Sequence, residues 1–353
     1  MRTEPVIEEM LESACPSIKY RILLEILGQS TASKEMLALQ DEILRDPNVQ
    51  EVLSWQQPDG WLAWDFHGSR SSETGIRILC EKGLSRQHPA LVRTLQALED
   101  HPERLDRGIG KAGRILDELG FGGSQMIRAT ICAYAGLEDS LFVKEQVNEA
   151  LRGFRAVLEL DSLRKFTEEY KGRLVFKPGV RWPSIYHLRL LAFTWKWRTE
   201  ENQVLLAAAV KRLVELSPIP DICVRNKSRR IAPASFCMHN FNPDTRLIDD
   251  VGWMMWFHRM ECLARLGVIE SIPELKRQVN SLEGLLEAGK GWFTRRLSHP
   301  YFAKWGAYTG LQLEPDWRHP IRREYDLTFR SMLISKGHFF RAGDSLHEYL
   351  PPL

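Results

Sequence analysis

The sequence has no long uncharged hydrophobic run and no apolar segment at its N-terminus. The first ten residues contain Glu4, Glu8 and Glu9, whereas a signal peptide needs a basic start followed by an apolar stretch. The most apolar region, residues 251–266, is interrupted by charged side chains, and a membrane-spanning helix needs about 20 mainly apolar residues. We therefore expect a cytoplasmic protein with no targeting peptide and no membrane partner.

A surplus of charge of either sign is also absent. Lys and Arg number 48 and Asp and Glu number 46, which gives a net charge of +2. Proteins that bind nucleic acid broadly carry a strong basic surplus, so we expect no nucleic-acid partner. Hydrophobic residues make up 44% of the 353 residues and charged residues 27%, which is typical of a globular protein. This length fits two ordinary domains or one large one.

Several motifs that would identify a chemistry are missing. The six cysteines are scattered and form no Cys-x-x-Cys pair, so we expect reduced, mostly buried thiols. The sequence contains neither a nucleophile elbow nor a phosphate-binding P-loop. Strand-like runs are scarce, and residues 174–176 are the best of them.

Six segments share one pattern, which is a capping residue, apolar residues around an arginine and, in most copies, a final glycine. They begin at Ser17, Ser72, Ser124, Ser184, Asp249 and Asp326. Ser and Asp are good N-cap residues because their side-chain oxygens accept hydrogen bonds from the first helical turn, and glycine suits the left-handed position after a helix. Start-to-start spacings of 52 to 77 residues predict one helical unit repeated six times and lengthened by insertions.

More amphipathic helices with a charged side are expected between these segments. Their ranges are 34–45, 89–100, 141–158, 201–216 and 273–288. The alternation predicts an all-α fold in which the first kind of helix is buried and the second faces water. The copy number favours a single domain over residues 1–353 that closes as an (α/α)6 toroid, a barrel of six inner and six outer helices with long connections. An open α-solenoid is the alternative.

The Gly- and Trp-rich connection QQPDGWLAWDFHG at residues 56–68, followed by SETGIRIL, resembles the terpenoid cyclase and protein prenyltransferase α/α-toroid superfamily. The resemblance covers the repeat pattern of most of the chain. It implies a barrel of twelve helices with a central cavity, open where the connections reach the inner helices. Such toroids host several activities. The Asp-x-Asp-Asp acid motif of the cyclases is absent, and Asp249-Asp250 lacks the further Asp at the required offset, which disfavours a cyclase mechanism.

The resemblance also raises the question of a zinc site. Protein prenyltransferases bind zinc through Asp, Cys and His, and residues 221–223 have the Asp-x-Cys spacing. A second set combines Cys237 and His239 in a loop with His258 and Cys262, which are four residues apart on one helix face. We favour the alternative that Cys262 and His258 are core side chains, and we assign no metal. The sequence does not name a cofactor.

An arginine recurs in all six copies: Arg21, Arg77, Arg128, Arg189, Arg259 and Arg330. In five copies it lies four or five residues after the cap, near the positive end of the helix dipole, where a cation needs an anionic partner. Structural ion pairs between copies are one explanation, with partners available at Glu25, Glu73, Glu118 and Glu261. Alternatively, some of the arginines hold an anionic ligand, because a guanidinium offers two parallel N–H donors to a phosphate or carboxylate.

Aromatic residues gather in the connections that lead into the buried helices, where a toroid would place a binding site. Aromatic faces beside charged side chains suit a sugar or an anionic small molecule. The ligand-binding candidates are Trp61, Trp64, Arg181, Trp182, Trp292, Trp305, Trp317, Arg322 and Arg323. The alternative for any one of these Trp residues is packing of its own loop onto the barrel.

Four side chains in or beside these connections are candidates for general acid–base catalysis: Asp65, His67, His239 and Asp250. A His near a carboxylate can donate or accept a proton near neutral pH. We therefore predict a toroid that binds, and in one version processes, an anionic small molecule or oligosaccharide in an aromatic-lined central cavity. The alternatives are a non-catalytic domain that binds a peptide or protein, and a prenyl-group or terpenoid-related enzyme. The sequence leaves open whether the protein is an enzyme.

Overall fold

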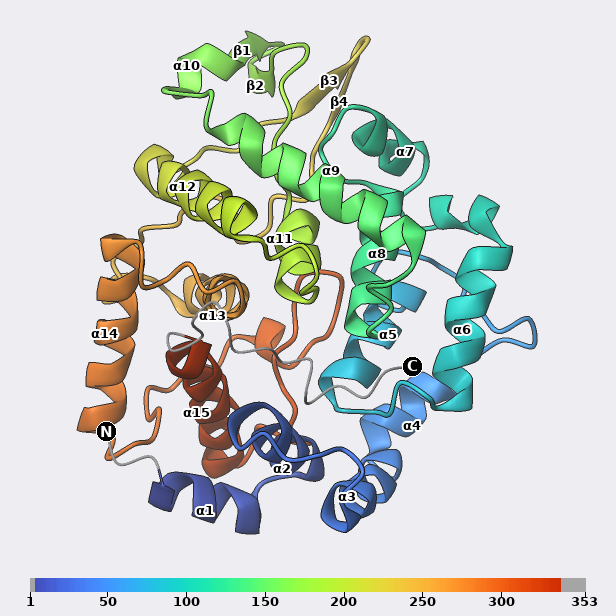
Figure 1. Cartoon of the computed structure of the whole chain (residues 1–353), viewed down its shortest axis with the longest axis vertical. Helices are drawn as coiled ribbons and strands as arrows, with labels where there is room; N and C mark the ends of the chain where they lie inside the picture. Colours follow the sequence, from blue (N-terminus) through green and yellow to red (C-terminus); the bar gives the residue numbers. More distant parts are fainter. Residues whose placement is uncertain (1–3, 338–353) are drawn as a thin grey trace.

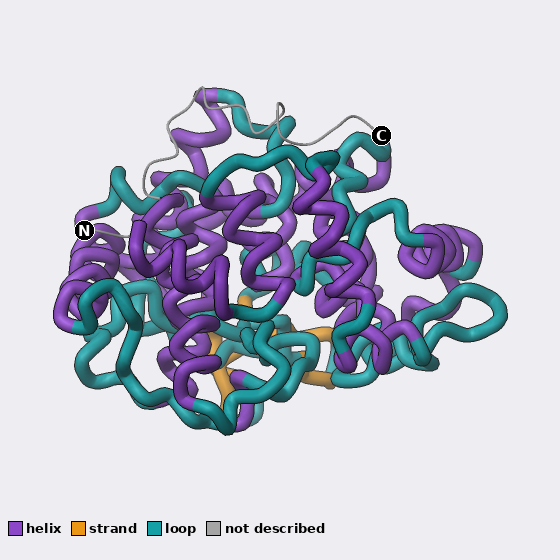
Figure 2. Tube along the Cα trace, turned by 90° about the horizontal axis from the view of Figure 1, so that it is seen from below, coloured by secondary structure: helices purple, strands orange, loops and turns teal. Residues whose placement is uncertain are grey.

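The computed structural model describes residues 4–337, and most of them are helical. Figure 1 shows the helices set around the middle of the molecule and the few strands at the upper edge, and Figure 2 shows these strands among loops. Within the described part, no helix has both the length and the apolar character needed to span a membrane. The helical class expected from the sequence is confirmed, with two small β-hairpins added to it.

Six helical segments, one for each repeated segment of the sequence, form the inner part of the fold. They are α2 (Pro16–Arg21) with the π-helical turn η1 (Ile22–Ile26), α5 (Ser72–Glu81), α8 (Ser124–Tyr134), α11 (Ile185–Ala192), α13 (Asp250–Arg265) and α15 (Pro320–Gly337). Helix α5 packs on α8, α8 on α11, α11 on α13, and α13 on α15. Helix α15 in turn contacts η1 and α2. The contacts thus follow chain order from α5 to α15 and lead from the last copy to the first, whereas the first and second copies are linked by the ion pair of Arg21 with Glu81.

A second set of helices lies at the periphery in Figure 1. It comprises α3 (Lys34–Leu44), α6 (Pro89–Asp100), α9 (Leu141–Val157), α12 (Glu200–Leu216) and α14 (Pro273–Ala288). These bounds agree with the five amphipathic ranges predicted from the sequence to within one residue. Helix α9 packs on α8, α11 and α12, and α14 packs on α15. The predicted division into buried and half-buried helices is confirmed for these elements.

The ends of the inner helices follow local capping chemistry, although several caps differ from the prediction. Asp249 caps α13 by accepting a hydrogen bond from Gly252 N at 2.7 Å, as expected. Ser184 caps α11 together with His187, whose ring accepts from the Ser184 backbone N–H. The predicted caps at Ser17, Ser72 and Ser124 instead lie inside their helices, which begin one residue earlier or directly at the serine. Left-handed glycines follow four of the helices, at Gly28, Gly83, Gly136 and Gly267.

The cap predicted at Asp326 is wrong. Helix α15 begins at Pro320, because proline suits a first helical turn, where its missing N–H is not needed. Asp326 lies inside the helix and is fully buried. Its carboxylate accepts hydrogen bonds from Leu313 N, Glu314 N and Trp317 Nε1 at 2.7, 3.0 and 2.6 Å. Asp326 therefore fastens the end of the long connection before α15 to the helix itself.

The remaining elements are short, and the repeat pattern does not predict them. The helical ones are α1 (Glu4–Ser13), α4 (Pro47–Leu53), η2 (Pro102–Asp106), α7 (Lys111–Glu118), α10 (Leu163–Phe166) and η3 (Pro300–Phe302). Two antiparallel hairpins pair β1 (Thr167–Tyr170) with β2 (Arg173–Phe176), and β3 (Val224–Asn226) with β4 (Arg229–Ile231). The strand-like run 174–176 lies in β2. Hydrogen bonds from Phe176 N to Cys223 O and from Cys223 N to Leu174 O join the hairpins.

Candidate functional site

A buried carboxylate, Glu73, organises a cluster of polar side chains at the start of α5. Its Oε2 lies 2.6 Å from His67 Nδ1, and its Oε1 accepts a hydrogen bond of 2.6 Å from the Tyr186 hydroxyl. The same hydroxyl lies 3.5 Å from His67 Nδ1. Glu73 occupies the first turn of α5, where the helix dipole favours a negative charge. Tyr186 occupies the first turn of α11, so two inner helices and one connection meet in this cluster.

The surroundings of His67 favour its protonated form. Burial alone would lower the pKa of His67, but the hydrogen bond to Glu73 and the charge of Glu73 outweigh it, so the pKa rises above its usual 6.5. Burial and the neighbouring Glu73 raise the pKa of Tyr186 well above 10, which keeps its hydroxyl protonated and donating. Because Glu73 engages Nδ1 of His67, the other ring nitrogen, Nε2, is available for proton exchange. His67 is 15% exposed, whereas Glu73 is 3% exposed.

Aromatic rings continue the site from His67 towards α13. The Tyr308 ring lies edge-on to His67 with centroids 5.8 Å apart, and it is tilted against Tyr186 at 6.0 Å. It also stacks on Phe236 at 5.7 Å, and Phe236 lies edge-on to His258 at 5.5 Å. These rings come from three connections and two inner helices. Tyr308, in the connection before α15, is the residue at which they meet.

Two buried arginines, Arg77 on α5 and Arg189 on α11, lie about one helical turn after Glu73 and Tyr186. They donate hydrogen bonds to the backbone on both sides of Tyr308. Arg189 Nη1 donates to Ala307 O at 2.9 Å, and Arg77 donates to Thr309 O. The Arg77 guanidinium also lies over the Trp305 ring, 5.0 Å from its centroid. Both arginines are almost fully buried, with exposures of 1% for Arg77 and 3% for Arg189.

Several buried side-chain nitrogens around Tyr308 have no hydrogen-bond partner within residues 4–337. They are Nε and Nη1 of Arg77, Nη2 of Arg189, and the Nε2 position of His258. No carboxylate of the described chain forms an ion pair with either arginine, although 26 other pairs are formed there. Buried donors without partners cost about 1–3 kcal/mol each. A buried cation without a counter-charge is more costly still.

Two arginine charges act on the side chains around Tyr308, and Glu73 and Glu81 act on Arg77 from a distance without forming an ion pair with it. Burial and the charge of Arg189 lower the pKa of Arg77. Burial and the charges of Arg189, Arg77 and Arg330 lower the pKa of His258 well below its usual 6.5, so His258 is neutral at physiological pH. We call the group formed by Arg77, Arg189 and His258 the cationic centre. Its charge and its free donors suit an anion.

The other recurring arginines have different surroundings. Arg330 donates to Glu261 at 2.8 Å and to Glu81 at 2.7 Å, and Arg21 donates to Glu25 at 2.5 Å. The predicted structural ion pairs are therefore present for these two. Arg128 instead lies over the Phe142 ring of α9, and Arg259 donates to Cys237 O at 2.9 Å. Neither forms an ion pair within residues 4–337, and the Nε of each also lacks a hydrogen-bond partner there.

The four catalytic candidates are not brought together. His67 belongs to the Glu73 cluster. Asp65 lies in the same connection, where its backbone pairs with that of Ser71. His239 Nδ1 contacts Ile219 O at 3.1 Å, and its Nε2 lies 3.3 Å from Asp221. Asp250 Oδ2 accepts hydrogen bonds from Ser298 N and His299 N at 2.7 and 3.0 Å, so this carboxylate fixes a connecting segment.

Among the ligand-binding candidates, Trp305 reaches the cationic centre through Arg77. Most of the others pack their own loops. Trp61 lies under Arg104, Trp182 stacks on Phe166, Trp292 packs on Tyr325 and Trp317 donates to Asp326. Arg181 pairs with Glu149 at 2.9 Å, Arg322 lies 3.9 Å from Glu314, and Arg323 is half-buried. Trp64 is 63% exposed and lies against Arg107.

The cysteine and histidine set considered for zinc does not form a metal cluster within residues 4–337. His239 is engaged with Ile219 and Asp221. Burial raises the pKa of the Cys237 thiol to about 11 and raises that of Cys262 as well. Both thiols are therefore protonated near neutral pH, and thiolate is the form that binds zinc.

Comparison with known proteins does not assign a function to this site. No family model matches the chain, and no curated protein or solved structure is significantly similar to it. The likeness to the α/α-toroid superfamily thus stays a prediction, and the chemistry of the site is the basis for its function.

Seven residues of the site were not among the catalytic and ligand-binding candidates predicted from the sequence: Glu73, Arg77, Tyr186, Arg189, Phe236, His258 and Tyr308. The recurrence of arginine is the signal that points to two of them, since Arg77 and Arg189 belong to the repeated set. Glu73 and Tyr186 follow the caps of their helices within two residues. The sequence alone carries no signal that these two side chains meet, because 113 positions separate them.

Proposed function

We propose that this protein is an (α/α)6 toroid that binds an anionic small molecule at the cationic centre. The observation that carries the proposal is the set of free N–H groups on Arg77 and Arg189, buried with no carboxylate partner in the described chain. A phosphate or carboxylate would satisfy these donors and offset the two charges. An anionic sugar fits equally, because the rings of Tyr308, Phe236 and Trp305 offer faces for stacking.

The toroid part of the proposal is supported by the order of helix contacts. Each inner helix from α5 to α15 packs on the next, and α15 packs on η1 and α2. An open solenoid would keep its first and last copies apart. The ion pairs of Arg330 with Glu81 and Glu261 also join side chains of α5, α13 and α15, as expected where copies converge.

The Glu73 cluster supplies the acid–base part of the proposal. His67, held through Nδ1 by Glu73, would give the proton on Nε2 to an oxygen of the bound anion or take a proton from it. Glu73 stabilises the protonated ring by its charge, and Tyr186 keeps Glu73 in place through its hydroxyl hydrogen bond. This assigns to His67 the role of catalytic residue, and to Glu73 and Tyr186 the role of positioning residues.

The test is a thermal-shift screen of the full chain against phosphate, pyrophosphate, citrate and glucuronate. A ligand that binds the folded state raises the unfolding temperature. We expect at least one anion to do so in the wild type and in Arg128→Met, and to give a clearly smaller shift in Arg77→Met and Arg189→Met. Arg128 is the matched control because it occupies the same repeat position but lies against Phe142 of α9.

Two outcomes would contradict the proposal. A shift of equal size in Arg77→Met and the wild type would place the anion elsewhere. If no anion shifts the wild type while a peptide or protein partner binds Trp64, the non-catalytic interaction domain is the better account.

A further inference from the structure

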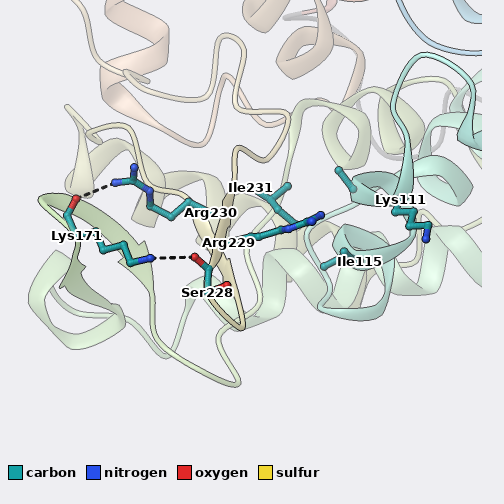
Figure 3. A pocket seen from close by; sticks show the side chains of 8 residues that line it. Lys111, Ile115, Lys171, Ser228, Arg229, Arg230 and Ile231 are labelled. Carbon is teal, nitrogen blue, oxygen red and sulfur yellow. Dashed lines mark hydrogen bonds between the residues drawn. The ribbon is translucent and has the colours of Figure 1, made fainter.

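A surface cavity of about 570 Å³ lies between the two hairpins and α7, and none of its lining residues belongs to the site described above. Ligand pockets commonly have volumes of about 300–1,000 Å³, so its size suits a small molecule. Figure 3 shows its lining, with Lys111 and Ile115 of α7 on one side and the hairpin residues on the other.

The charged side chains that line the cavity are all basic. They are Lys111 from α7, Lys171 from the β1–β2 turn, and Arg229 and Arg230 from β4. No Asp or Glu is among the lining residues. Neither Lys111 nor Arg229 forms an ion pair with any residue in the range 4–337, whereas nearby Arg225 pairs with Glu168 at 3.4 Å. Cations that converge without a counter-charge favour an anionic ligand.

The hairpins hold two of the basic side chains in fixed positions. Arg230 Nη1 donates to Lys171 O at 2.9 Å, and Lys171 Nζ donates to Ser228 O at 3.4 Å. Both interactions are drawn in Figure 3. Lys171 itself has a positive φ of 51°, a backbone conformation that Gly or Asn would adopt at lower cost.

The segment before α7 leaves space at the first turn of the helix. Residues 108–113 read Gly-Ile-Gly-Lys-Ala-Gly. Gly108 packs against the backbone of His67 and Gly113 against Ser124, where a side chain would not fit. Gly110 has a φ of 64°, and a Cβ there would meet nothing. The backbone N–H groups of a helix N-terminus favour anions, and the first turn of α7 contains Lys111 and no acidic residue.

The cavity also has an apolar part, formed by Ile115 and Ile231. From these observations we infer that the cavity binds a small organic molecule with a phosphate group. The phosphate lies between Lys111 and Arg229 at the start of α7, and the organic part packs on the two isoleucines. This site is independent of the cationic centre and carries no catalytic step.

Calorimetric titration of the full chain with phenyl phosphate, inorganic phosphate and phenol tests the inference. Phenyl phosphate should bind the wild type more tightly than inorganic phosphate does, and phenol should not bind. The double variant Lys111→Gln/Arg229→Gln should raise the Kd for phenyl phosphate at least tenfold. Arg225→Gln is the matched control, because Arg225 is an exposed arginine of the same hairpin outside the lining, and it should leave the Kd within twofold.

The inference fails if the wild type does not bind phenyl phosphate at millimolar concentration, or if Arg225→Gln weakens binding as much as the double variant does. It also fails if the variants affect only binding to vesicles of phosphatidylcholine with phosphatidic acid, which would assign the phosphate to a lipid surface. Arg77→Met should retain the binding of phenyl phosphate, so failure at this cavity is distinguishable from failure at the cationic centre.

Discussion

Replacement of Arg77 by methionine is expected to leave the protein as stable as the wild type or more stable, although Arg77 is one of its most buried side chains. The variant loses the hydrogen bond to Thr309 O and the stacking on Trp305, which are worth about 1 kcal/mol each. It also removes two buried donors without partners, which cost about 1–3 kcal/mol each. The free energy of unfolding should therefore stay unchanged or rise by up to about 4 kcal/mol.

Arg330→Met is the matched comparison, since Arg330 has the same repeat position and the same 1% exposure. It donates to Glu261 and Glu81, so its removal leaves buried carboxylates with fewer partners. Loss of one partner of a buried ion pair costs about 3–5 kcal/mol. Urea unfolding followed by circular dichroism measures both variants. An equal loss of stability in Arg77→Met would refute the reasoning, because it would make Arg77 a structural residue like Arg330.

Three further predictions concern proton binding and packing. The pKa of His67, followed by NMR of its ring protons, should lie above 6.5 in the wild type and below 6.5 in Glu73→Gln, because burial remains while the counter-charge is lost. Burial raises the pKa of Glu314 to about 7, so the stability contributed by its protonated form is fully present below pH 4.5, and up to about 3 kcal/mol of it is lost as the pH rises through 7. Urea unfolding at pH 5, 6, 7 and 8 should show that Glu314→Gln lacks this fall. Gly122→Ala should lower the unfolding temperature by an amount equal to about 2 kcal/mol or more, because φ is +71° and a Cβ would overlap the His187 ring.

The helical class and the outer helices could be predicted because their signals are local. The range 89–100 begins at a proline and ends before a His-Pro step, and it matches α6. The range 273–288 begins at a proline and ends before a glycine, and it matches α14. Local signals failed at Asp326, where the repeat pattern suggested a cap. The start of α15 at Pro320 instead of Asp326 depends on a contact that the local sequence does not show. The Asp326 carboxylate accepts hydrogen bonds from the backbone of the 311–317 segment, so Asp326 lies inside the helix.

The candidate site was predictable only in part. His67 could be found because it lies in a connection rich in aromatic residues, and Arg77 and Arg189 because their residue type recurs. The sequence does not show which of six arginines lack a carboxylate, since Arg330 gains its partners from α5 and α13. Trp61 and Trp182 were predicted to bind a ligand, but both are buried beneath their own loops. The glycines of residues 108–113 lie beside the surface cavity, and the repeat pattern does not point to them.

The most direct test of the cationic centre is a crystal structure of the protein grown in sodium bromide, with bromide located by its anomalous scattering. The account predicts a bromide peak within hydrogen-bond distance of the free nitrogens of Arg77 and Arg189, and no such peak in Arg77→Met. A carboxylate of the chain itself paired with Arg77, or bromide found only at other positions, would contradict it.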